Sequence, residues 1–307
     1  LLKKLILKKP KLVIMVDCGS TSNNAIDYLN YNNIKSIIID HHEISKPYPK
    51  SNVIINPKKN INYIEYDYLC ATTLTYFFID KVIKKTKSQF NLSNFLIYVL
   101  LATVCDVMPL RKINKIIASN VIRDFKLENN LAFKTIFDQL ELKKKLTIDD
   151  LGFLIGPIIN SGGRLGFSSY GVELLSSDNK KILETKTSQL IKLNKRRKII
   201  EKNILDEVNF EKINDENKNI IIYYNKNIHE GIIGIIASRL KDFSNKPTIV
   251  LTKSNNILKA SARSTTNYNI GEVIKTLVNN KIIEKGGGHN MAGGFSMHKS
   301  KLLDFKN

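Results

Sequence analysis

Titratable side chains follow two apolar runs near the start of the chain, where they could hold a metal ion. Asp40 and His41 stand at the end of the run in IIIDHHE, residues 37–43, and Asp17 ends the run in KLVIMVDCGS, residues 11–20. Because the carboxyl ends of parallel strands meet at one edge of a sheet, these three side chains are expected in one crevice. Carboxylates and an imidazole gathered there suit Mn²⁺ or Mg²⁺. For Asp17 alone, capping of a neighbouring helix is an equally good interpretation.

A fourth polar position and a glycine-rich segment add to these candidates. Asp106 ends a predicted helix in VCDVMPL, where Pro109 is expected to turn the chain. In KGGGHNMAGG, residues 285–294, three glycines precede His289. Glycines allow a ligand to approach the backbone closely, and their N–H groups can hold phosphate oxygens. The alternative is a glycine-rich turn that binds nothing.

Two arginines lie beside small residues in short motifs. Arg164 ends SGGR and Arg263 lies within SARS. The planar guanidinium of arginine fits a phosphate diester, so both are candidate nucleic-acid contacts. Tyr170 and Tyr268 could stack on bases, although such tyrosines are more often simply packed.

The order of the predicted elements indicates an α/β protein with a parallel sheet, followed by a second α/β domain. Strand, helix and strand at this spacing form a βαβ unit. A long charged helix with little apolar surface is expected to act as a connector that packs on little else. The expected elements are strands at 11–17, 34–40, 52–57 and 220–224, helices at 20–30, 69–85, 92–106 and 179–208, helical structure over 113–155, a glycine-rich stretch at 155–166 and a polar linker at 211–219. The predicted division is a first domain over residues 1–150, a glycine-rich segment and connector helix over 151–208, and a second domain over 209–307.

Composition limits the class of protein and of partner. The 307 residues are 43% hydrophobic, as in a globular chain, and carry a formal charge of +20, which favours a polyanionic partner. Abundant Lys, Asn and Ile could instead reflect an AT-rich genome. The three cysteines, Cys18, Cys70 and Cys105, have no metal-type spacing and predict a reducing, cytoplasmic location. No apolar run is long enough to span a membrane.

Seven motifs occur in the order and at about the spacing seen in one family. They are VDCGS, DHH, CDVMPL, INSGGRLG, HEGIIGIIASRL, KASARS and GGGHNMAGG, and they extend from Leu12 to Phe295. In this respect the chain resembles RecJ-type exonucleases of the DHH phosphoesterase superfamily. The resemblance implies a DHH domain with a parallel sheet, joined by a long helix to a smaller α/β DHH-associated domain.

The resemblance also implies an activity and roles for individual residues. It predicts a single-strand-specific 5′→3′ DNA exonuclease of repair and recombination, with helicase and single-strand-binding protein as partners. Asp17, His41 and Asp106 would bind two divalent metals, usually Mn²⁺. Asp40 and His42 would act close to the metals, and His289 would meet the scissile phosphate. The DNA contacts would come from Asn160, Arg164, Ser261, Arg263, Ser264, Gly287 and Gly288.

The chain also departs from the pattern of that family. The earlier DxD motif, which supplies further metal ligands, does not occur in the sequence, and neither does the family's C-terminal OB-fold. Together with the first residue, Leu1, this predicts an internal fragment of a longer protein, inactive alone although its parent is a nuclease. Two other functions stay open: an oligonucleotide or cyclic-dinucleotide phosphodiesterase of the same superfamily, and a non-catalytic DNA-binding relative.

Overall fold

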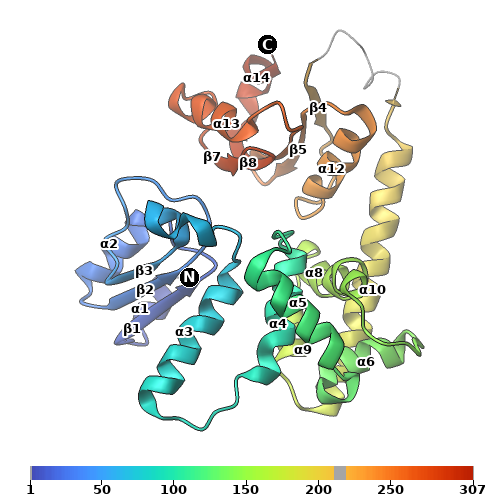
Figure 1. The fold of residues 1–307 in the computed structure, drawn as a ribbon. Helices are drawn as coiled ribbons and strands as arrows, with labels where there is room; N and C mark the ends of the chain where they lie inside the picture. The colour runs from blue at the N-terminus through green and yellow to red at the C-terminus, as the bar shows by residue number, and fades with distance from the viewer. Residues whose placement is uncertain (1, 211–218, 307) are drawn as a thin grey trace. The chain divides into compact units, whose positions relative to one another are not determined.

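The computed structural model describes residues 2–210 and 219–306, so the expected linker at 211–219 lies almost wholly outside the described residues. The chain divides into two compact units (Figure 1). Unit 1 comprises residues 1–134 and 142–156, and unit 2 comprises residues 135–141 and 157–307. The three-part division at residues 150 and 208 stays a prediction. No helix in the described ranges is long and apolar enough to cross a membrane.

Unit 1 contains a parallel three-stranded sheet in the order β1-β2-β3. Its crossover helix α2 buries Ile26 and Leu29 against Ile38 of the sheet. The strands are β1 (Leu12–Val16), β2 (Lys35–Ile39) and β3 (Val53–Ile55), and the helix is α2 (Asn23–Tyr31). The predicted α/β class and the βαβ unit are therefore confirmed.

The first strand, β1, is more exposed than the buried strand that was predicted. Leu12, Ile14 and Val16 are 44%, 47% and 43% exposed. Within the described sheet β1 lies at the edge, and only its alternate residues Val13 and Met15 pack against the layer that contains α2. Five apolar residues in succession resemble a strand that is covered on both faces, and so burial was the wrong inference from this run.

A helical layer completes unit 1, and its centre is α4. This helix is apolar along its whole length, and Ile97, Val99, Leu100 and Leu101 are buried. The two predicted helices over 69–85 and 92–106 are present with slightly different ends. Helix α1 (Leu2–Ile6) instead packs in the core that contains α2, through Leu2 and Ile6. The elements of the helical layer are η1 (Pro57–Lys59), η2 (Ile61–Tyr66), α3 (Ala71–Thr86), η3 (Ser93–Phe95), α4 (Leu96–Cys105), α5 (Lys112–Asp124), η4 (Leu127–Asn129), α7 (Ile148–Asp150) and the π-helical η5 (Leu151–Ile155), and α6 (Leu131–Gln139) crosses the boundary between the units.

The glycine-rich stretch at 155–166 is largely helical. Its helix α8 (Gly156–Arg164) is followed by α9 (Ser169–Leu175) and the 27-residue α10 (Lys180–Asp206). Ser161 is fully buried and donates a hydrogen bond to Leu190 O of α10, at 3.0 Å. The long helix is therefore present as predicted. It packs more than expected of a bare connector, because Leu183, Leu190 and Ile204 are buried.

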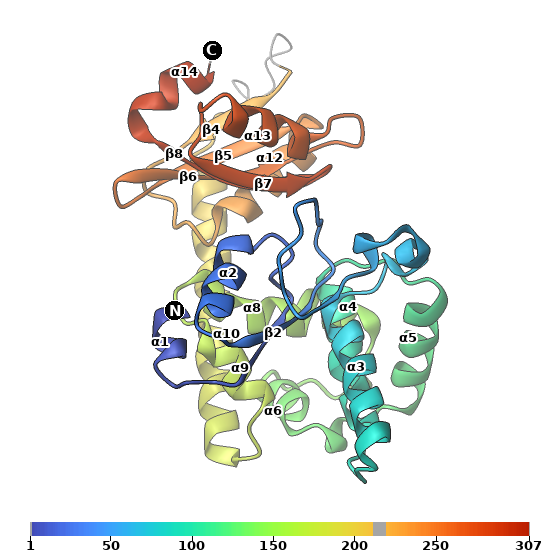
Figure 2. The ribbon, with the colours of Figure 1, turned by 90° about the vertical axis from the view of Figure 1, so that its left-hand side faces the viewer.

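Unit 2 also contains a mixed five-stranded sheet in the order β4-β5-β6-β8-β7 (Figure 2). Alternate residues of β5 face two different cores: Val250 packs with α12 and the end of α10, whereas Ile249 and Leu251 pack with α13. The predicted strand at 220–224 and the α/β character of this region are confirmed. The elements are β4 (Ile221–Tyr224), α12 (Ile233–Ser244), β5 (Thr248–Ser254), β6 (Ile257–Arg263), α13 (Ile270–Asn279), β7 (Lys285–His289), β8 (Ala292–His298), η6 (Lys299–Lys301) and α14 (Leu302–Lys306).

The glycine-rich segment near the C-terminus is a β-hairpin, and its three glycines lie in the strand β7 rather than in a turn. β7 pairs antiparallel with β8, and Gly288 lies opposite Gly293. A Cβ on Gly288 would come within 2.6 Å of Gly293 Cα, and one on Gly286 within 2.8 Å of Ile274 on α13. Close packing of the hairpin therefore accounts for these two glycines.

Candidate metal centre

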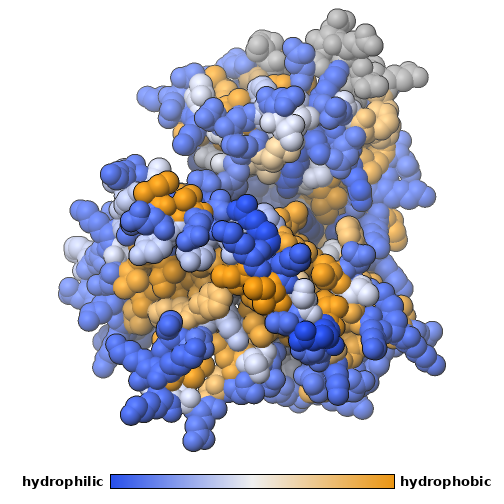
Figure 3. All heavy atoms as spheres, in the orientation of Figure 1, coloured by the Kyte–Doolittle hydropathy of each residue, from blue (hydrophilic) through white to orange (hydrophobic). Residues whose placement is uncertain are grey.

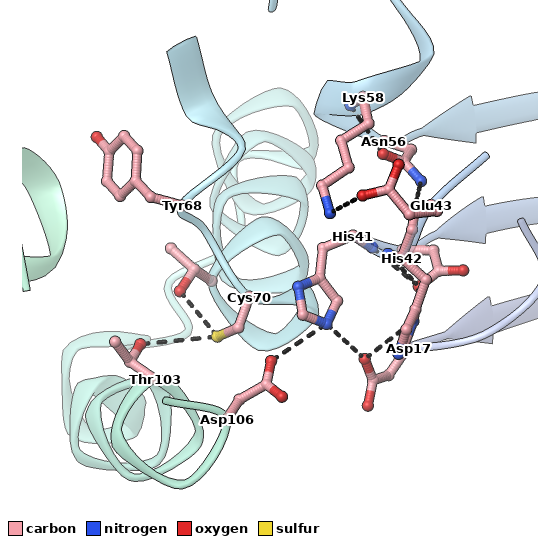
Figure 4. A network of polar contacts seen from close by, with 12 residues as sticks. Asp17, His41, His42, Glu43, Asn56, Lys58, Tyr68, Cys70, Thr103 and Asp106 are labelled. Atoms are coloured by element: carbon pink, nitrogen blue, oxygen red, sulfur yellow. Dashed lines mark hydrogen bonds and ion pairs between the residues drawn. The ribbon is translucent and has the colours of Figure 1, made fainter. Parts of the chain in front are cut away.

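A polar site that includes His41, His42 and Asn56 lies at the carboxyl ends of the unit 1 strands (Figure 4), and a buried aspartate forms its base. Asp40 follows β2 and is 1% exposed. Its carboxylate accepts backbone N–H bonds from Ser20 at 3.0 Å, from His41 at 2.8 Å and from His42 at 3.3 Å. Burial raises the pKa of Asp40, but the hydrogen bonds from Ser20 and His42 outweigh it and lower that pKa to about 2. Asp40 is therefore ionised and orients the two loops around it.

His41 joins two acidic residues that are far apart in the sequence. Its Nε2 atom lies 3.3 Å from Asp17 Oδ1 and 3.2 Å from Asp106 Oδ2. Burial alone would lower the pKa of His41, but the hydrogen bond that it donates to Asp17 and the charge of Asp106 raise that pKa above its ordinary value. One imidazole nitrogen thus lies close to an oxygen of each carboxylate, so that the three atoms could bind one shared cation.

His42 is oriented by the buried acid. Its Nδ1 lies 2.7 Å from Asp40 Oδ1 and 3.9 Å from Asp17 Oδ1. Asp17, His41 and His42 can offer ligand atoms that all lie within 4.8 Å of one another. A carboxylate on one nitrogen of a histidine fixes the ring and leaves the other nitrogen to define the direction of coordination. His42 is therefore a possible metal ligand, in addition to the role close to the metals that the family resemblance predicts for it.

The backbone conformation at Asp17 and next to Asp106 holds both of these carboxylates in place. Asp17 has φ of 60°, and its N–H continues the strand pairing to Ile39 O at 2.9 Å. Asp106 is the C-cap of α4, and the next residue, Val107, has φ of 55°. The chain therefore turns at Val107, two residues before Pro109, and a left-handed conformation at a β-branched residue is strained.

Asn56 is a site residue that the sequence reading missed. It follows β3, is 6% exposed, and donates from Nδ2 to Ser20 Oγ at 2.8 Å and to His42 O at 2.9 Å. It thereby ties the third strand to the two loops that carry the acids and histidines. The rule that selected Asp17 and Asp40, a polar residue at the carboxyl end of a parallel strand, applies equally to Asn56 in NVIINP.

In unit 2, Arg164 and Arg263 form a second cluster of charge. Arg164 donates to Gly231 O at 3.0 Å, and Arg263 donates to Ser261 Oγ at 3.2 Å and Ala262 O at 2.8 Å. Burial lowers the pKa of both guanidinium groups. The charge of Arg197 lowers that of Arg164 further, and the charge of Arg164 lowers that of Arg263. Among the described residues no carboxylate lies in salt-bridge range of either arginine, which suits an anionic ligand.

Two glycines of HEGIIG make room for this arginine pair. A Cβ on Gly231 would lie 2.1 Å from Arg164 O, and one on Gly234 would lie 3.1 Å from Arg263 Nη2 and 3.1 Å from Ser261 Oγ. The sequence showed this motif only as part of the family pattern. Its physical basis is the close approach of three segments of unit 2.

The other predicted nucleic-acid contacts are spread over unit 2. Asn160 is exposed on α8, whereas Ser264 is 1% exposed and donates to Tyr268 O at 2.6 Å. Gly287 and His289 are exposed on β7, and a Cβ on Gly287 would meet no atom within 4 Å. The metal-site candidates therefore belong to unit 1, and His289 and the arginines belong to unit 2.

Two models of known domain families match this chain, one near its start and one near its end. The model of the "DHH family, N-terminal domain" matches residues 2–103, and that of the "DHHA1 domain" matches residues 217–307. The single-stranded-DNA-specific exonuclease RecJ of Haemophilus influenzae is 29% identical over 98% of this chain, and the Escherichia coli protein of the same name is 29% identical over 96%. The chain therefore resembles the DHH family in its first part, the DHHA1 domain in its last part and RecJ exonucleases over nearly its whole length.

Solved structures show the same fold as the RecJ-like chain. RecJ of Thermus thermophilus in complex with Mn²⁺ superimposes with a TM-score of 0.86 at 21% identity, over 99% of this chain and 45% of that one. A manganese-bound exonuclease RecJ superimposes with a TM-score of 0.81 at 22% identity, over 99% of this chain and 75% of that one. The RecJ-like chain spans 56% and 55% of the length of the Haemophilus and Escherichia relatives.

Proposed function

We propose that this chain, or the longer protein of which it is part, is a single-strand-specific DNA exonuclease that hydrolyses phosphodiester bonds in the 5′→3′ direction. The observation that carries the proposal is the position of His41 Nε2, 3.3 Å from Asp17 and 3.2 Å from Asp106, beside the fixed pair of Asp40 and His42. The names of the relatives, single-stranded-DNA-specific exonucleases, supply the substrate class.

The donor set fits Mn²⁺ or Mg²⁺. Asp17 and Asp106 offer carboxylate oxygens, and His41 and His42 offer imidazole nitrogens. A mixture of carboxylate and imidazole favours Mn²⁺, whereas Mg²⁺ prefers oxygen ligands alone. When bound, such ions lower the pKa of a coordinated water and stabilise charge on the phosphate oxygens during in-line displacement.

The remaining side chains would support that chemistry without binding metal. Asp40 fixes His42 and the backbone of the DHH segment, so the ligands need no rearrangement during the reaction. Arg164 and Arg263 would hold phosphates of the strand, and Asn160, Ser261, Ser264, Gly287 and Gly288 remain proposed contacts of the same kind. His289 would stabilise developing charge on the phosphate. Cys105 would not act as a nucleophile, because burial and the neighbouring Asp106 raise the pKa of its thiol to about 11 and thus favour the protonated form.

The rival functions make different use of the same site. A non-catalytic DNA-binding relative would need the arginines of unit 2 but not the histidines of unit 1. An oligonucleotide or cyclic-dinucleotide phosphodiesterase would need the metal site and would prefer short substrates to long strands. Helicase and single-strand-binding protein as partners, and a cytoplasmic location, are proposals of the family resemblance and the cysteine content.

The test is hydrolysis of a 5′-phosphorylated single strand with Mn²⁺, measured in the longer protein that the family resemblance predicts, for the unchanged sequence, His41→Ala and a matched His298→Ala control. His298 is an exposed histidine of unit 2 that lies 2.8 Å from Ser300 Oγ. We expect His41→Ala to lose more than about a hundredfold in rate and His298→Ala to lose little. Equal rates for His41→Ala and the unchanged chain would contradict the proposal. Faster cleavage of dinucleotides than of long strands would favour the phosphodiesterase.

A further inference from the structure

A large cavity in unit 1 adjoins the site described above, and none of the proposed metal ligands line it. Its volume is about 760 Å³, within the range of small-molecule pockets. Aromatic side chains from three segments, the loop before β3, η2 and α3, line it together with aliphatic residues of β3 and α3. The aromatic residues are Tyr48, Tyr63, Tyr66 and Phe77.

The aromatic side chains of this cavity are exposed rather than packed. Tyr63 is 57%, Phe77 39% and Tyr66 37% exposed. Figure 3 shows apolar residues at the surface of unit 1 in the region of the sheet and α3. By contrast the ring of Tyr170, a base-stacking candidate in the sequence, already packs against other side chains. The Phe167 ring centroid lies 5.1 Å from that of Tyr170, and the Lys186 ammonium lies 3.8 Å from it. The cavity therefore has the ring faces that an outside ligand could cover.

The charge around the cavity is positive. Lys46 and Lys59 are among its lining residues, and no acidic residue is. The Lys59 ammonium lies 5.7 Å from the Tyr48 ring, and Tyr48 donates to Lys59 O at 3.3 Å, which joins η1 to the preceding loop. A ligand that combines a flat apolar group with nearby negative charge would match this lining.

One residue belongs both to the cavity and to the metal centre. Asn56 lines the cavity, and the same side chain donates to Ser20 Oγ and to His42 O. The cavity therefore begins at the carboxyl end of β3, directly beside the strand end that carries Asp40 and His41. A polymer with a phosphate at the metal centre would bring its neighbouring groups to the cavity.

We infer that this cavity receives one unpaired base of a nucleic-acid strand whose phosphate lies at the metal centre. The inference rests on the proposed function and deepens it, because a base can enter only when it is not paired. Rings of tyrosine and phenylalanine stack on any base, and Lys46 and Lys59 attract the flanking phosphates. An acidic peptide with an aromatic residue would satisfy the same lining, but it would have no reason to lie beside a phosphodiester centre.

The experiment removes bases one at a time. Single strands of about ten nucleotides with hydrolysis-resistant phosphorothioate linkages, each with one abasic position, are bound to the 307-residue chain with Mn²⁺, and affinity is measured by fluorescence anisotropy. At one position the missing base should weaken binding about five- to a hundredfold. In a Tyr63→Ala and Tyr66→Ala double variant, binding of the intact strand should fall by a similar factor, and the abasic position should then cost almost nothing more.

The matched control is Tyr31→Ala, which removes a tyrosine that is 85% exposed in α2 and is not part of the cavity. It should keep both the affinity and the abasic effect. The inference is overturned if no abasic position matters, if the double variant keeps the full abasic effect, or if an acidic aromatic peptide binds the cavity and the strand does not compete. If the strand is hydrolysed but no abasic position affects its binding, only this inference fails. If an abasic position affects binding but no Mn²⁺-dependent hydrolysis occurs, only the proposed function fails.

Discussion

The metal centre of unit 1 and the arginine pair of unit 2 are built in opposite ways. In unit 1, many donors converge on one buried acid, and Asp40 accepts hydrogen bonds from Ser20, His41 and His42. In unit 2, side chains are left out, and Gly231 and Gly234 create the space that Arg164 and Arg263 occupy. The first site depends on hydrogen bonds and the second on volume. One is suited to a cation and the other to an anion, so different substitutions should damage each.

The largest effect expected is a clean separation of metal binding between the two units. Asp106→Ala should weaken Mn²⁺ binding by more than about a hundredfold, because it removes one of the carboxylates next to His41. Arg263→Gln should leave Mn²⁺ affinity unchanged. Calorimetric titration of both variants measures this. Loss of Mn²⁺ binding in Arg263→Gln would show that the two sites are not independent.

Gly231→Ala should destabilise unit 2 by about 3 kcal/mol, because its new Cβ would overlap the backbone oxygen of Arg164. Gly163→Ala is the matched control, since its Cβ would meet no atom within 4 Å and Gly163 lies in α8. That control should be neutral or stabilising by up to about 1 kcal/mol. Urea unfolding of both variants gives the comparison. Equal stability of the two variants would refute the role of space at Gly231.

Acid should weaken unit 1 through Asp40. The pKa of Asp40 is about 2 in the folded chain, below its ordinary 3.8, so its contribution is present above about pH 4 and is lost as the pH falls toward 2. That contribution is about 2 kcal/mol. Asp40→Asn should remove it and should flatten the dependence of unfolding free energy on pH between 4 and 2, since an amide does not ionise and only one of its two terminal atoms can accept N–H bonds. An unchanged pH profile in Asp40→Asn would assign the acid effect to other carboxyl groups.

The smallest effect expected concerns salt. If Arg164 and Arg263 each contact one phosphate, then Arg164→Gln or Arg263→Gln should reduce the slope of log affinity against log salt by about 1 for a single strand. Arg123→Gln is the control, because Arg123 is an exposed residue of unit 1 whose guanidinium is paired with Asp124 at 2.7 Å. Slopes that fall equally in all three variants would show only a general loss of charge.

The sequence predicts the metal-site candidates well, because a parallel sheet imposes a simple rule. Polar residues at the ends of successive strands must meet, and Asp17, Asp40 and His41 do so. The same rule holds for Asn56 at the end of β3, but an uncharged side chain is a weaker indication of a metal site than an aspartate or a histidine. Proximity of Asp106 to His41 depends on the packing of α4 against α3, which in turn contacts β1 and β2, and the family resemblance rather than periodicity predicted that contact.

Glycine-rich stretches are where local reading of the sequence failed. SGGR lies in a helix because Ser161 and Gly162 pack against α10, and a Cβ on Gly162 would lie 3.1 Å from Leu190. KGGGH is a strand because its glycines allow close contact with β8 and α13. Glycine favours turns by its own conformational preference, but burial of neighbouring surfaces outweighs a preference of about 1 kcal/mol.

The glycines of β7 have a further consequence for exchange of backbone hydrogens. β7 is an edge strand whose five residues are all exposed, whereas β5 lies inside the sheet with Thr248–Thr252 buried. Ordering three consecutive glycines costs more conformational entropy than ordering other residues. The amide hydrogens of β7 should therefore exchange early through local opening, while those of β5 should exchange only with global unfolding. A ligand that binds along β7 would slow exchange there first, so the hydrogen-exchange pattern of this one hairpin reports on its occupancy.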